Sequence, residues 1–108
     1  MADSQSFTRI ALGLPGTVSA PHFDRTAFKV KRTFATLAAD GLSANLKFTP
    51  EEQELKCLVA PQIFQAIDNG WGRQGWTTMT LASATEADIA AALELAHAHA
   101  LPVRPAKP

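Results

Sequence analysis

Cysteine is nearly absent from the sequence, since Cys57 is the only one among 108 residues. A single thiol cannot form an internal disulfide, and it leaves almost no basis for a zinc site built from cysteines. No run of 18 consecutive apolar residues occurs, and residues 1–7 lack a basic stretch followed by an apolar one. We therefore expect no membrane span, no export signal and a soluble protein of the reducing cytoplasm.

Net charge and catalytic motifs are lacking as well. The 10 Lys and Arg residues balance 10 Asp and Glu residues, so no overall electric field draws the protein towards polyanions. The sequence has no phosphate-binding P-loop, no dinucleotide-binding fingerprint and no GxSxG nucleophile elbow. The sequence therefore indicates no particular reaction. We expect a protein that is not an enzyme and that uses no catalytic residue, cofactor or metal.

The composition itself is that of a folded protein. Hydrophobic residues make up 46% of the chain and charged residues 19%, which is typical of a globular domain. A chain of this length builds one modest hydrophobic core. We expect a single domain over residues 1–101 and an irregular tail over residues 102–108, which contain three prolines.

Hydrophobic periodicity predicts the elements of the first half. Apolar residues at positions 7, 10, 11 and 14 share one helical face, and Pro15-Gly16 ends that helix. Alternation over residues 28–31 predicts a strand, with a second strand beginning near Phe34. Asp40-Gly41 predicts a hairpin turn with positive φ at both turn residues. In the strand that follows, one face holds Leu42, Ala44, Leu46 and Phe48, and the other holds Ser43, Asn45 and Lys47.

Residues 49–67 contain the clearest helix signal. Thr49 and Glu52 form a capping box, with Pro50 at the first helical position. The spacing of the following apolar residues predicts an inward-facing side for this helix. That side comprises Leu55, Leu58 and Val59. Residues 63–67 fit either a short helical turn or a short strand.

The remaining elements follow a glycine-containing turn over residues 71–76. Thr77, Met79 and Leu81 alternate with polar or amphipathic residues and predict another strand. Residues 83–86 cap a final helix, whose buried line comprises Ile89, Leu93, Ala96 and Ala100. The order α-β-β-β-α-β-β-α predicts an α+β two-layer sandwich, an antiparallel sheet with helices packed on one face.

Several stretches spanning nearly the whole chain resemble, in order and spacing, the MmcQ/YjbR family. They are Ala11-Leu12-Gly13-Leu14-Pro15-Gly16, Pro21-His22-Phe23, Ala27-Phe28-Lys29-Val30, Phe34-Ala35-Thr36-Leu37, Lys47-Phe48, Pro50-Glu51-Glu52-Gln53 and Trp71-Gly72-Arg73-Gln74-Gly75-Trp76. The resemblance implies a bacterial protein with a frataxin-like (CyaY-like) fold, in a family commonly described as DNA-binding. Asp24 and residues 31–33 stand where the family pattern leads us to expect glycine, which leaves the loop geometry of the first hairpin open.

A local charge asymmetry carries the functional prediction. Residues 25–39 contain four basic residues and no acidic one. If Phe28 points into the core, period two places Lys29 and Lys31 on the open sheet face, where Asn45 and Lys47 can join them. Ammonium groups beside an aromatic plane can hold phosphates and stack a base. The predicted nucleic-acid-binding residues are Lys29, Lys31, Arg32, Lys47, Arg73 and Trp76. The alternative is that these lysines only keep the sheet face solvated.

Other candidate residues have simpler interpretations. Trp71 is expected to anchor its loop to the core, whereas the role of Trp76 is left open. His97 and His99 are two apart on a predicted helix, so their rings diverge and a shared metal is not expected. His22 beside Asp24 has no accompanying nucleophile and is interpreted as a loop or packing residue. Cys57, near a helix C-terminus, is interpreted as an inert thiol.

The sequence thus predicts a non-enzymatic protein that binds DNA or RNA through a basic sheet face and the Trp71 to Trp76 loop. Sequence specificity cannot be inferred. The alternative is a protein-protein interaction module that uses the same sheet and loop, for which zero net charge is no handicap. A monomer is the favoured oligomeric state.

Overall fold

The computed structural model describes residues 2–101, so the predicted irregular tail over 102–108 lies outside the described residues. Within the described range, the chain forms four α-helices and one antiparallel sheet with strand order β1-β2-β3-β4-β6-β5. The strands are β1 (Val18–His22), β2 (Arg25–Lys29), β3 (Thr33–Ala38), β4 (Ser43–Lys47), β5 (Phe64–Ala66) and β6 (Trp76–Thr80). The helices are α1 (Ser4–Leu12), α2 (Pro50–Val59), α3 (Gly70–Arg73) and α4 (Glu86–Ala100), and a short 3-10 helix, Leu81–Ser83, precedes α4.

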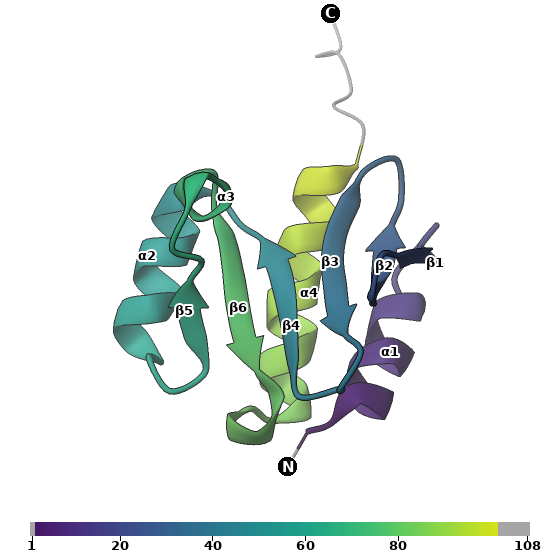
Figure 1. Cartoon of the computed structure of the whole chain (residues 1–108), viewed down its shortest axis with the longest axis horizontal. Coiled ribbons are helices and arrows are strands. Elements are labelled where there is room, and N and C mark those ends of the chain that lie inside the picture. The colour runs from purple at the N-terminus through teal and green to yellow at the C-terminus, as the bar shows by residue number, and fades with distance from the viewer. Residues whose placement is uncertain (1, 102–108) are drawn as a thin grey trace, which may run out of the picture.

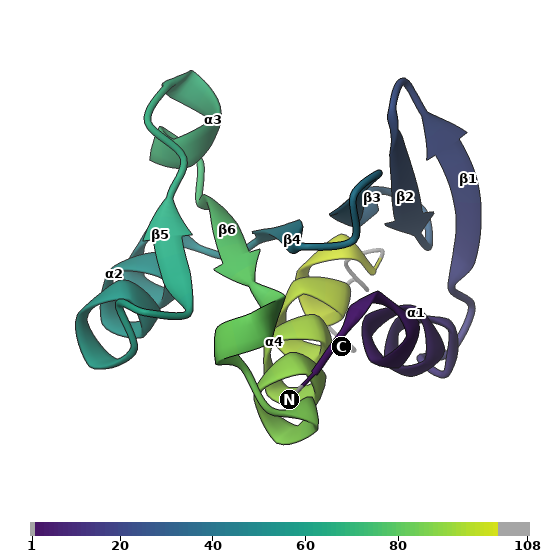
Figure 2. The same ribbon diagram turned by 60° about the horizontal axis from the view of Figure 1, so that its bottom comes forward.

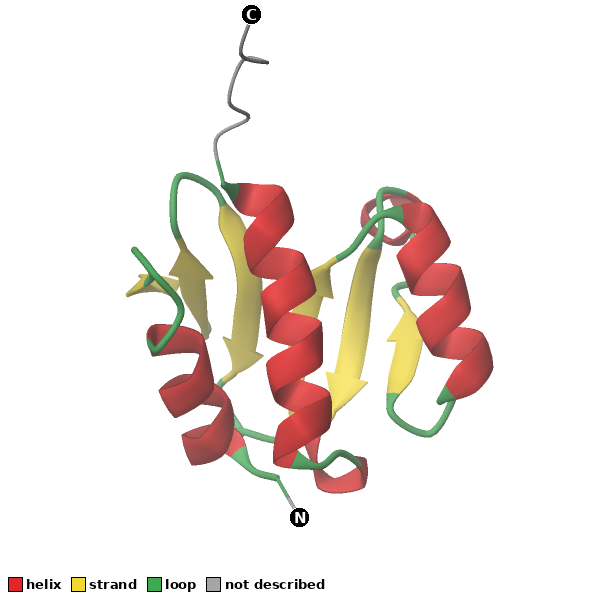
Figure 3. Ribbon diagram, turned by 180° about the vertical axis from the view of Figure 1, so that it is seen from behind, coloured by secondary structure: helices red, strands yellow, loops and turns green. Residues whose placement is uncertain are grey.

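The three longer helices cover one face of the sheet, which confirms the predicted α+β two-layer architecture. Seen from behind, α4 runs along the middle strands, α1 lies beside it and α2 covers the β5 edge (Figure 3). Figure 1 shows the opposite, open face, where no long helix of the described chain lies.

The element order contains one strand more than the sequence predicted before α2. The additional strand, β1, is the outermost of the sheet, and four of its five residues are exposed. An edge strand that buries neither face carries no apolar alternation, so periodicity cannot detect it. The segment at residues 63–67, left open between helix and strand, contains the three-residue strand β5. Residues 70–73 form the short helix α3.

The core lies between the sheet and α4. The predicted line of Ile89, Leu93, Ala96 and Ala100 is buried against the sheet. The helix begins two residues later than a capping box starting at Ser83 would place it. Its N-cap is Thr85, whose hydroxyl accepts a hydrogen bond from the Asp88 backbone, while the Asp88 carboxylate accepts one from the Thr85 backbone. Capping signals at residues 83–86 therefore gave the right element and a slightly displaced start.

The β3–β4 hairpin forms where Asp40-Gly41 predicted it, with a different turn. Only Gly41 has positive φ, at 73°, and the Asp40 carboxylate accepts a hydrogen bond from the Leu42 backbone. The loop covers residues 39–42 instead of a two-residue primed turn. Leu42 lies in this loop and is 66% exposed, contrary to its predicted place in the core. The rest of the predicted β4 alternation is confirmed, because Ala44, Leu46 and Phe48 are fully buried.

Helix α2 has the predicted capping box but the opposite orientation. Thr49 caps the helix with Glu52 at the third helical position. Leu55, Leu58 and Val59, predicted to face the core, are 61%, 77% and 72% exposed. The inward side instead presents Lys56, whose ammonium lies 5.1 Å from the centre of the Phe64 ring and 5.6 Å from that of Phe48. A cation–π contact and the aliphatic stem of a lysine thus replace leucine packing at this sheet edge.

Candidate nucleic-acid interface

Strand register decides which side chains share the open face. Ala27 pairs with Thr36, Thr36 with Asn45, and Asn45 with Thr78, so this row crosses the sheet from β2 to β6. Cross-strand partners lie on the same face. Their neighbours in the chain, such as Phe28 and Leu46, are fully buried on the helix side. The row therefore forms the floor of the open face.

The open face contains a groove with a volume of about 410 Å³. In Figure 2, the β1–β2 hairpin and α3 rise on opposite sides of the central strands. Side chains from the hairpin and from the segment around α3 face each other across the floor. The groove is lined by His22, Arg25, Thr33, Thr36, Asn45, Ile67, Asn69, Trp71 and Trp76. No acidic residue of the described chain is among them.

Arg25 is the cation of the groove. Its Nε donates a hydrogen bond to the Thr36 hydroxyl at 2.8 Å, and its Nη2 donates one to the Thr36 carbonyl at 3.3 Å. Both acceptors are neutral, and within residues 2–101 no carboxylate forms an ion pair with this guanidinium. The half-buried charge is thus oriented by the protein but not neutralised by it.

The wall around α3 depends on two glycines that admit no side chain. A Cβ atom on Gly72 would lie 1.6 Å from the carbonyl oxygen of Ile67, and one on Gly75 would lie 1.9 Å from that of Phe48. Gly75 also has a φ of 112°. Gln53 on α2 secures the same segment, since its Nε2 donates to the carbonyls of Gly72 and Trp76, both at 2.9 Å. The loop is held by its backbone.

Since backbone contacts hold the loop in place, Trp71 does not need to be buried in the core. Trp71 is 61% exposed and lines the groove, so the prediction that it anchors the loop is wrong. Asn69 caps α3, its Oδ1 accepting hydrogen bonds from the backbones of Trp71 and Gly72. Trp76 is half-buried and faces the same groove. The two indoles of the chain therefore lie on one wall.

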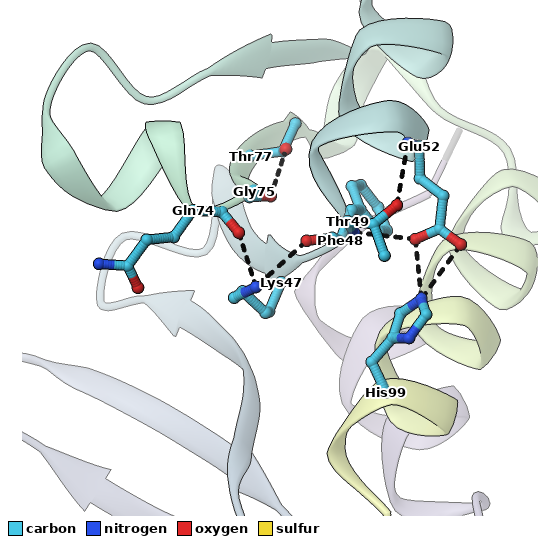
Figure 4. Close-up of polar contacts among 8 residues, drawn as sticks. All are labelled: Lys47, Phe48, Thr49, Glu52, Gln74, Gly75, Thr77 and His99. Atoms are coloured by element: carbon cyan, nitrogen blue, oxygen red, sulfur yellow. Dashed lines mark hydrogen bonds and ion pairs between the residues drawn. The ribbon is translucent and has the colours of Figure 1, made fainter.

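Lys47 is tied to the end of this wall. It pairs with Trp76 across the strands. Its ammonium donates to the carbonyls of Gln74 at 2.6 Å and Phe48 at 3.3 Å, as Figure 4 shows. Nearby, a smaller hollow of about 130 Å³ is lined in part by Arg32, Lys47, Trp76 and His99. The structure thus brings three of the six predicted binding residues, Arg32, Lys47 and Trp76, together around this smaller hollow.

His99 lines the smaller hollow from the helix layer and contacts Glu52. His99 Nε2 lies 2.9 Å from one Glu52 carboxylate oxygen and 3.1 Å from the other, a contact drawn in Figure 4. Burial raises the pKa of the Glu52 carboxyl, but hydrogen bonds from the Thr49 backbone and His99 outweigh it and bring the pKa below its usual value. The pair connects α4 to the N-terminus of α2.

The family model described as YjbR matches residues 12–99, which is most of the chain. The chain belongs to the YjbR family. The crystal structure of Deinococcus radiodurans protein DR2400, described as a DUF419 domain, is similar in fold, with a TM-score of 0.74 and 21% identity over 89% of this chain and 76% of that one. No curated protein matches the chain. The resemblance drawn from the sequence motifs is thereby confirmed, and the fold similarity agrees with it.

The other predicted residues of this YjbR-family chain do not line the groove. Lys29 is the last residue of β2 and is exposed, whereas Lys31 and Arg32 lie in the turn between β2 and β3. The predicted strand over 28–31 therefore extends two residues beyond the end of β2, and the period-two argument does not apply to Lys31. A register shift opposite Phe28 and Lys29 leaves Phe34 unpaired, so that Phe34 and Ala35 are both buried. Arg73 is exposed at the end of α3.

Of the nine residues that line the groove, Trp76 alone belongs to the predicted site, and the missed residues with charged or aromatic side chains are His22, Arg25 and Trp71. The first two lie on the β1–β2 hairpin, where His22 pairs directly with Arg25. Recognising β1 requires knowing its partner, because its own sequence gives no alternation. Arg25 did contribute to the basic count that suggested the patch. Asn45 was correctly placed on the open face beside Lys47.

Contrary to the absence inferred from the sequence, the GxGxxG spacing of a dinucleotide-binding fingerprint does occur, at glycines 70, 72 and 75, but its structural setting differs from a dinucleotide site. Strands β5 and β6 run antiparallel, and the helix between them has four residues. A dinucleotide site needs parallel strands and a longer helix whose N-terminus meets the pyrophosphate. Here the glycines serve the close backbone contacts described above.

The remaining histidines and the cysteine have separate surroundings. His97 is buried, with its Nε2 2.8 Å from the Pro15 carbonyl oxygen and its ring edge-on to Phe34. It points to a different element from His99, as helical geometry predicted. Cys57 is half-buried on α2. Within residues 2–101, no three His, Cys, Asp or Glu side chains form a metal-binding group, and no helix is long and apolar enough to cross a membrane.

Proposed function

We propose that this YjbR-family protein binds single-stranded nucleic acid along the open face of its sheet, and that it acts by binding and not by catalysis. The observation that carries the proposal is the groove, which combines two tryptophans and an unneutralised arginine without an acidic lining residue. Aromatic faces stack on unpaired bases, and cations hold the phosphates between them. DNA and RNA both offer these groups.

A single strand suits this surface better than a duplex. The tryptophans lie on one wall of the groove, where a duplex cannot bring its stacked bases against an indole. Outside the groove lining, Lys29, Lys31 and Arg32 are exposed at the β2–β3 turn, and Arg73 is exposed at the end of α3. The Lys47 ammonium already donates hydrogen bonds to two carbonyls. It therefore contributes its positive charge to binding, and less of its hydrogen-bonding capacity.

The proposal is tested by fluorescence anisotropy with labelled single strands of DNA and RNA, each about 15 nucleotides long, and with the matching duplexes. We expect micromolar dissociation constants for single strands at low salt and weaker binding of duplexes. About four neutralised phosphates give a slope of roughly −3 in log affinity against log salt. Failure of every single strand to bind micromolar protein at low salt contradicts the proposal.

Arg32 and Arg9 provide a matched pair of charge-removing variants. Arg9 lies on α1 in the helix layer, paired with Glu86 at 2.8 Å. Arg32→Ala should weaken single-strand binding about twofold to fivefold and flatten the salt slope by less than about one unit. Arg9→Ala removes the same charge from the opposite layer and should leave affinity unchanged. Equal losses in both variants would indicate a nonspecific charge effect.

A second candidate function is the binding of a protein partner. The observation that favours it is the outward side of α2, where Leu55, Leu58 and Val59 are largely exposed and adjacent at helical spacing. A pull-down from nuclease-treated extract tests it. Recovery of one dominant protein by the native chain, and its loss with Leu58→Gln, would support this function.

A further inference from the structure

The two walls of the groove differ in chemistry. The wall formed by α3 and β6 carries the indoles of Trp71 and Trp76, whereas the β1–β2 hairpin carries Arg25 and His22. Cross-strand pairing of His22 with Arg25 places both on the same face of the hairpin. A planar group suits the first wall, and an anion suits the second. A ligand that spans the groove therefore needs both groups in one molecule.

Arg25 is prepared for an anion. Two of its N–H groups are engaged by Thr36, which fixes the plane of the guanidinium. A guanidinium has five N–H donors, so three remain for a ligand. The bonds to Thr36 reduce the rotamer entropy that the arginine loses when it binds. A half-buried cation with only neutral partners gains more from an arriving anion than an arginine that is already in an ion pair.

The floor offers hydrogen-bonding groups to the edge of a planar ligand. The Oδ1 of Asn45 accepts a hydrogen bond from the Thr78 hydroxyl at 2.9 Å, which orients its amide. Within residues 2–101, no protein acceptor bonds the amide nitrogen of Asn45, which lies on the groove floor. The amide nitrogen of Asn45 can therefore donate a hydrogen bond to a ring nitrogen or a carbonyl of a base.

The volume limits the size of the ligand. About 410 Å³ falls in the lower part of the range for small-molecule sites. It accommodates one nucleotide unit and not a stretch of strand. A longer single strand would therefore place one unit in the groove and extend past it towards the exposed cations of the β2–β3 turn or of α3.

We propose that the groove is a subsite for a single nucleotide, with the base against Trp76 and Trp71, its edge on Asn45, and the phosphate on Arg25 with His22 beside it. This inference rests on the proposed binding of single-stranded nucleic acid and names the unit that the groove holds. The free ligand of the same chemistry is a nucleoside monophosphate. The subsite discriminates nucleotides from nucleosides through Arg25.

Intrinsic fluorescence is a direct probe of this subsite. The chain has two tryptophans and no tyrosine, and both tryptophans line the groove. The native chain is titrated with the four ribonucleoside monophosphates, the four nucleosides and ribose phosphate. We expect the monophosphates to quench the emission in a saturable way. Nucleosides should bind about tenfold more weakly, because a charge-assisted hydrogen bond contributes about one power of ten.

Arg25→Gln and Arg9→Gln separate the groove from the rest of the surface. Arg25→Gln should abolish the preference for nucleotides over nucleosides, whereas Arg9→Gln removes a cation from the helix layer and should leave that preference intact. The two indole N–H resonances in an NMR spectrum of the native chain give a reading that needs no variant. Both should shift when a monophosphate is added.

The outcomes distinguish the subsite from the wider function. If single strands bind in the anisotropy assay but monophosphates leave both indole resonances and the emission unchanged, the subsite is wrong and the proposed function stands. If monophosphates bind while no strand binds, the subsite is right and the strand-binding function is wrong. Equal quenching by nucleosides and nucleotides overturns the assignment of the phosphate to Arg25.

Discussion

The guanidinium of Arg25 lies across the neighbouring strand, with its Nε 2.8 Å from the hydroxyl oxygen of Thr36. This contact joins β2 to β3 on the open face and directs the remaining donors of Arg25 into the groove. Position 36 therefore affects binding through orientation, although its own hydroxyl is occupied. The variant that separates these roles is Thr36→Val, which keeps the shape of the side chain.

Thr36→Val should weaken single-strand binding about threefold to tenfold, because Arg25 loses a hydrogen bond worth about 1 kcal/mol to its orientation. The free energy of unfolding should fall by about 1 kcal/mol or less. Anisotropy and urea unfolding measure the two effects. Thr80→Val is the control, since Thr80 shares the open face but does not line the groove. Equal affinities for both variants would mean that Thr36 does not position Arg25.

Gly72→Ala should destabilise the protein by about 2–4 kcal/mol. The added methyl group meets the Ile67 carbonyl at 1.6 Å, and relieving this overlap requires movement of the backbone. Gly70→Ala is the matched control within the same short helix. Its Cβ would lie 3.6 Å from the Arg73 side chain, an ordinary contact. Thermal unfolding should therefore show a large loss for the first variant and a small change for the second.

Stability should fall in acid partly through Glu52, whose pKa in the folded state is below its ordinary value of 4.5. A carboxyl with a lowered folded-state pKa stabilises the protein fully above the unfolded pKa, and that contribution is lost as the pH falls through the folded pKa. Glu52→Gln keeps a capping-box residue but removes this dependence. Native chain and variant should differ by less than about 1 kcal/mol near pH 7.

That difference in free energy of unfolding should shrink between about pH 5 and pH 3, when urea unfolding is repeated across the range. Asp3 and Glu86 also have lowered pKa values, held by hydrogen bonds from Ser6 and Arg9 respectively, and they act in the same direction in both proteins. A difference that stays constant over the acid range would exclude the contact with Glu52 as a source of pH dependence.

Leu58→Ala should cost less than about 0.5 kcal/mol, despite a helical spacing that suggests a core residue. Its side chain is exposed on the outward side of α2. Leu46→Ala, at a fully buried position of β4, should cost about 2–5 kcal/mol. Urea unfolding of the two variants measures the contrast. A large loss at position 58 would mean that another surface covers α2 in solution.

Local signals in the sequence predicted much of the fold. The Thr49 capping box, the alternation through β4 and the buried line of α4 each depend on residues close in sequence, and each is confirmed. The side of α2 that faces the sheet could not be predicted this way. The orientation of α2 depends on contacts with residues outside the helix: Lys56, and not a leucine, packs against the rings of Phe48 and Phe64.

The groove was less predictable than the fold, for the same reason. Its two walls come from β1–β2 and from α3, which are distant in sequence and are brought face to face by the sheet. Trp71 looked like a core residue because indoles are usually buried, and only the backbone contacts of Gly72 and Gly75 show why it need not be. Pairing of His22 with Arg25 likewise depends on an edge strand without a periodic pattern.

Pro21 lies in β1, the strand that ends the sheet on one side. A proline is tolerated in a paired strand only where its nitrogen points away from the partner, so it removes a donor from the outer edge. The strand at the other side, β5, has three residues. An extended chain arriving from another molecule thus finds an incomplete row of donors on one border and a short row on the other. Both features oppose fibril growth by strand addition.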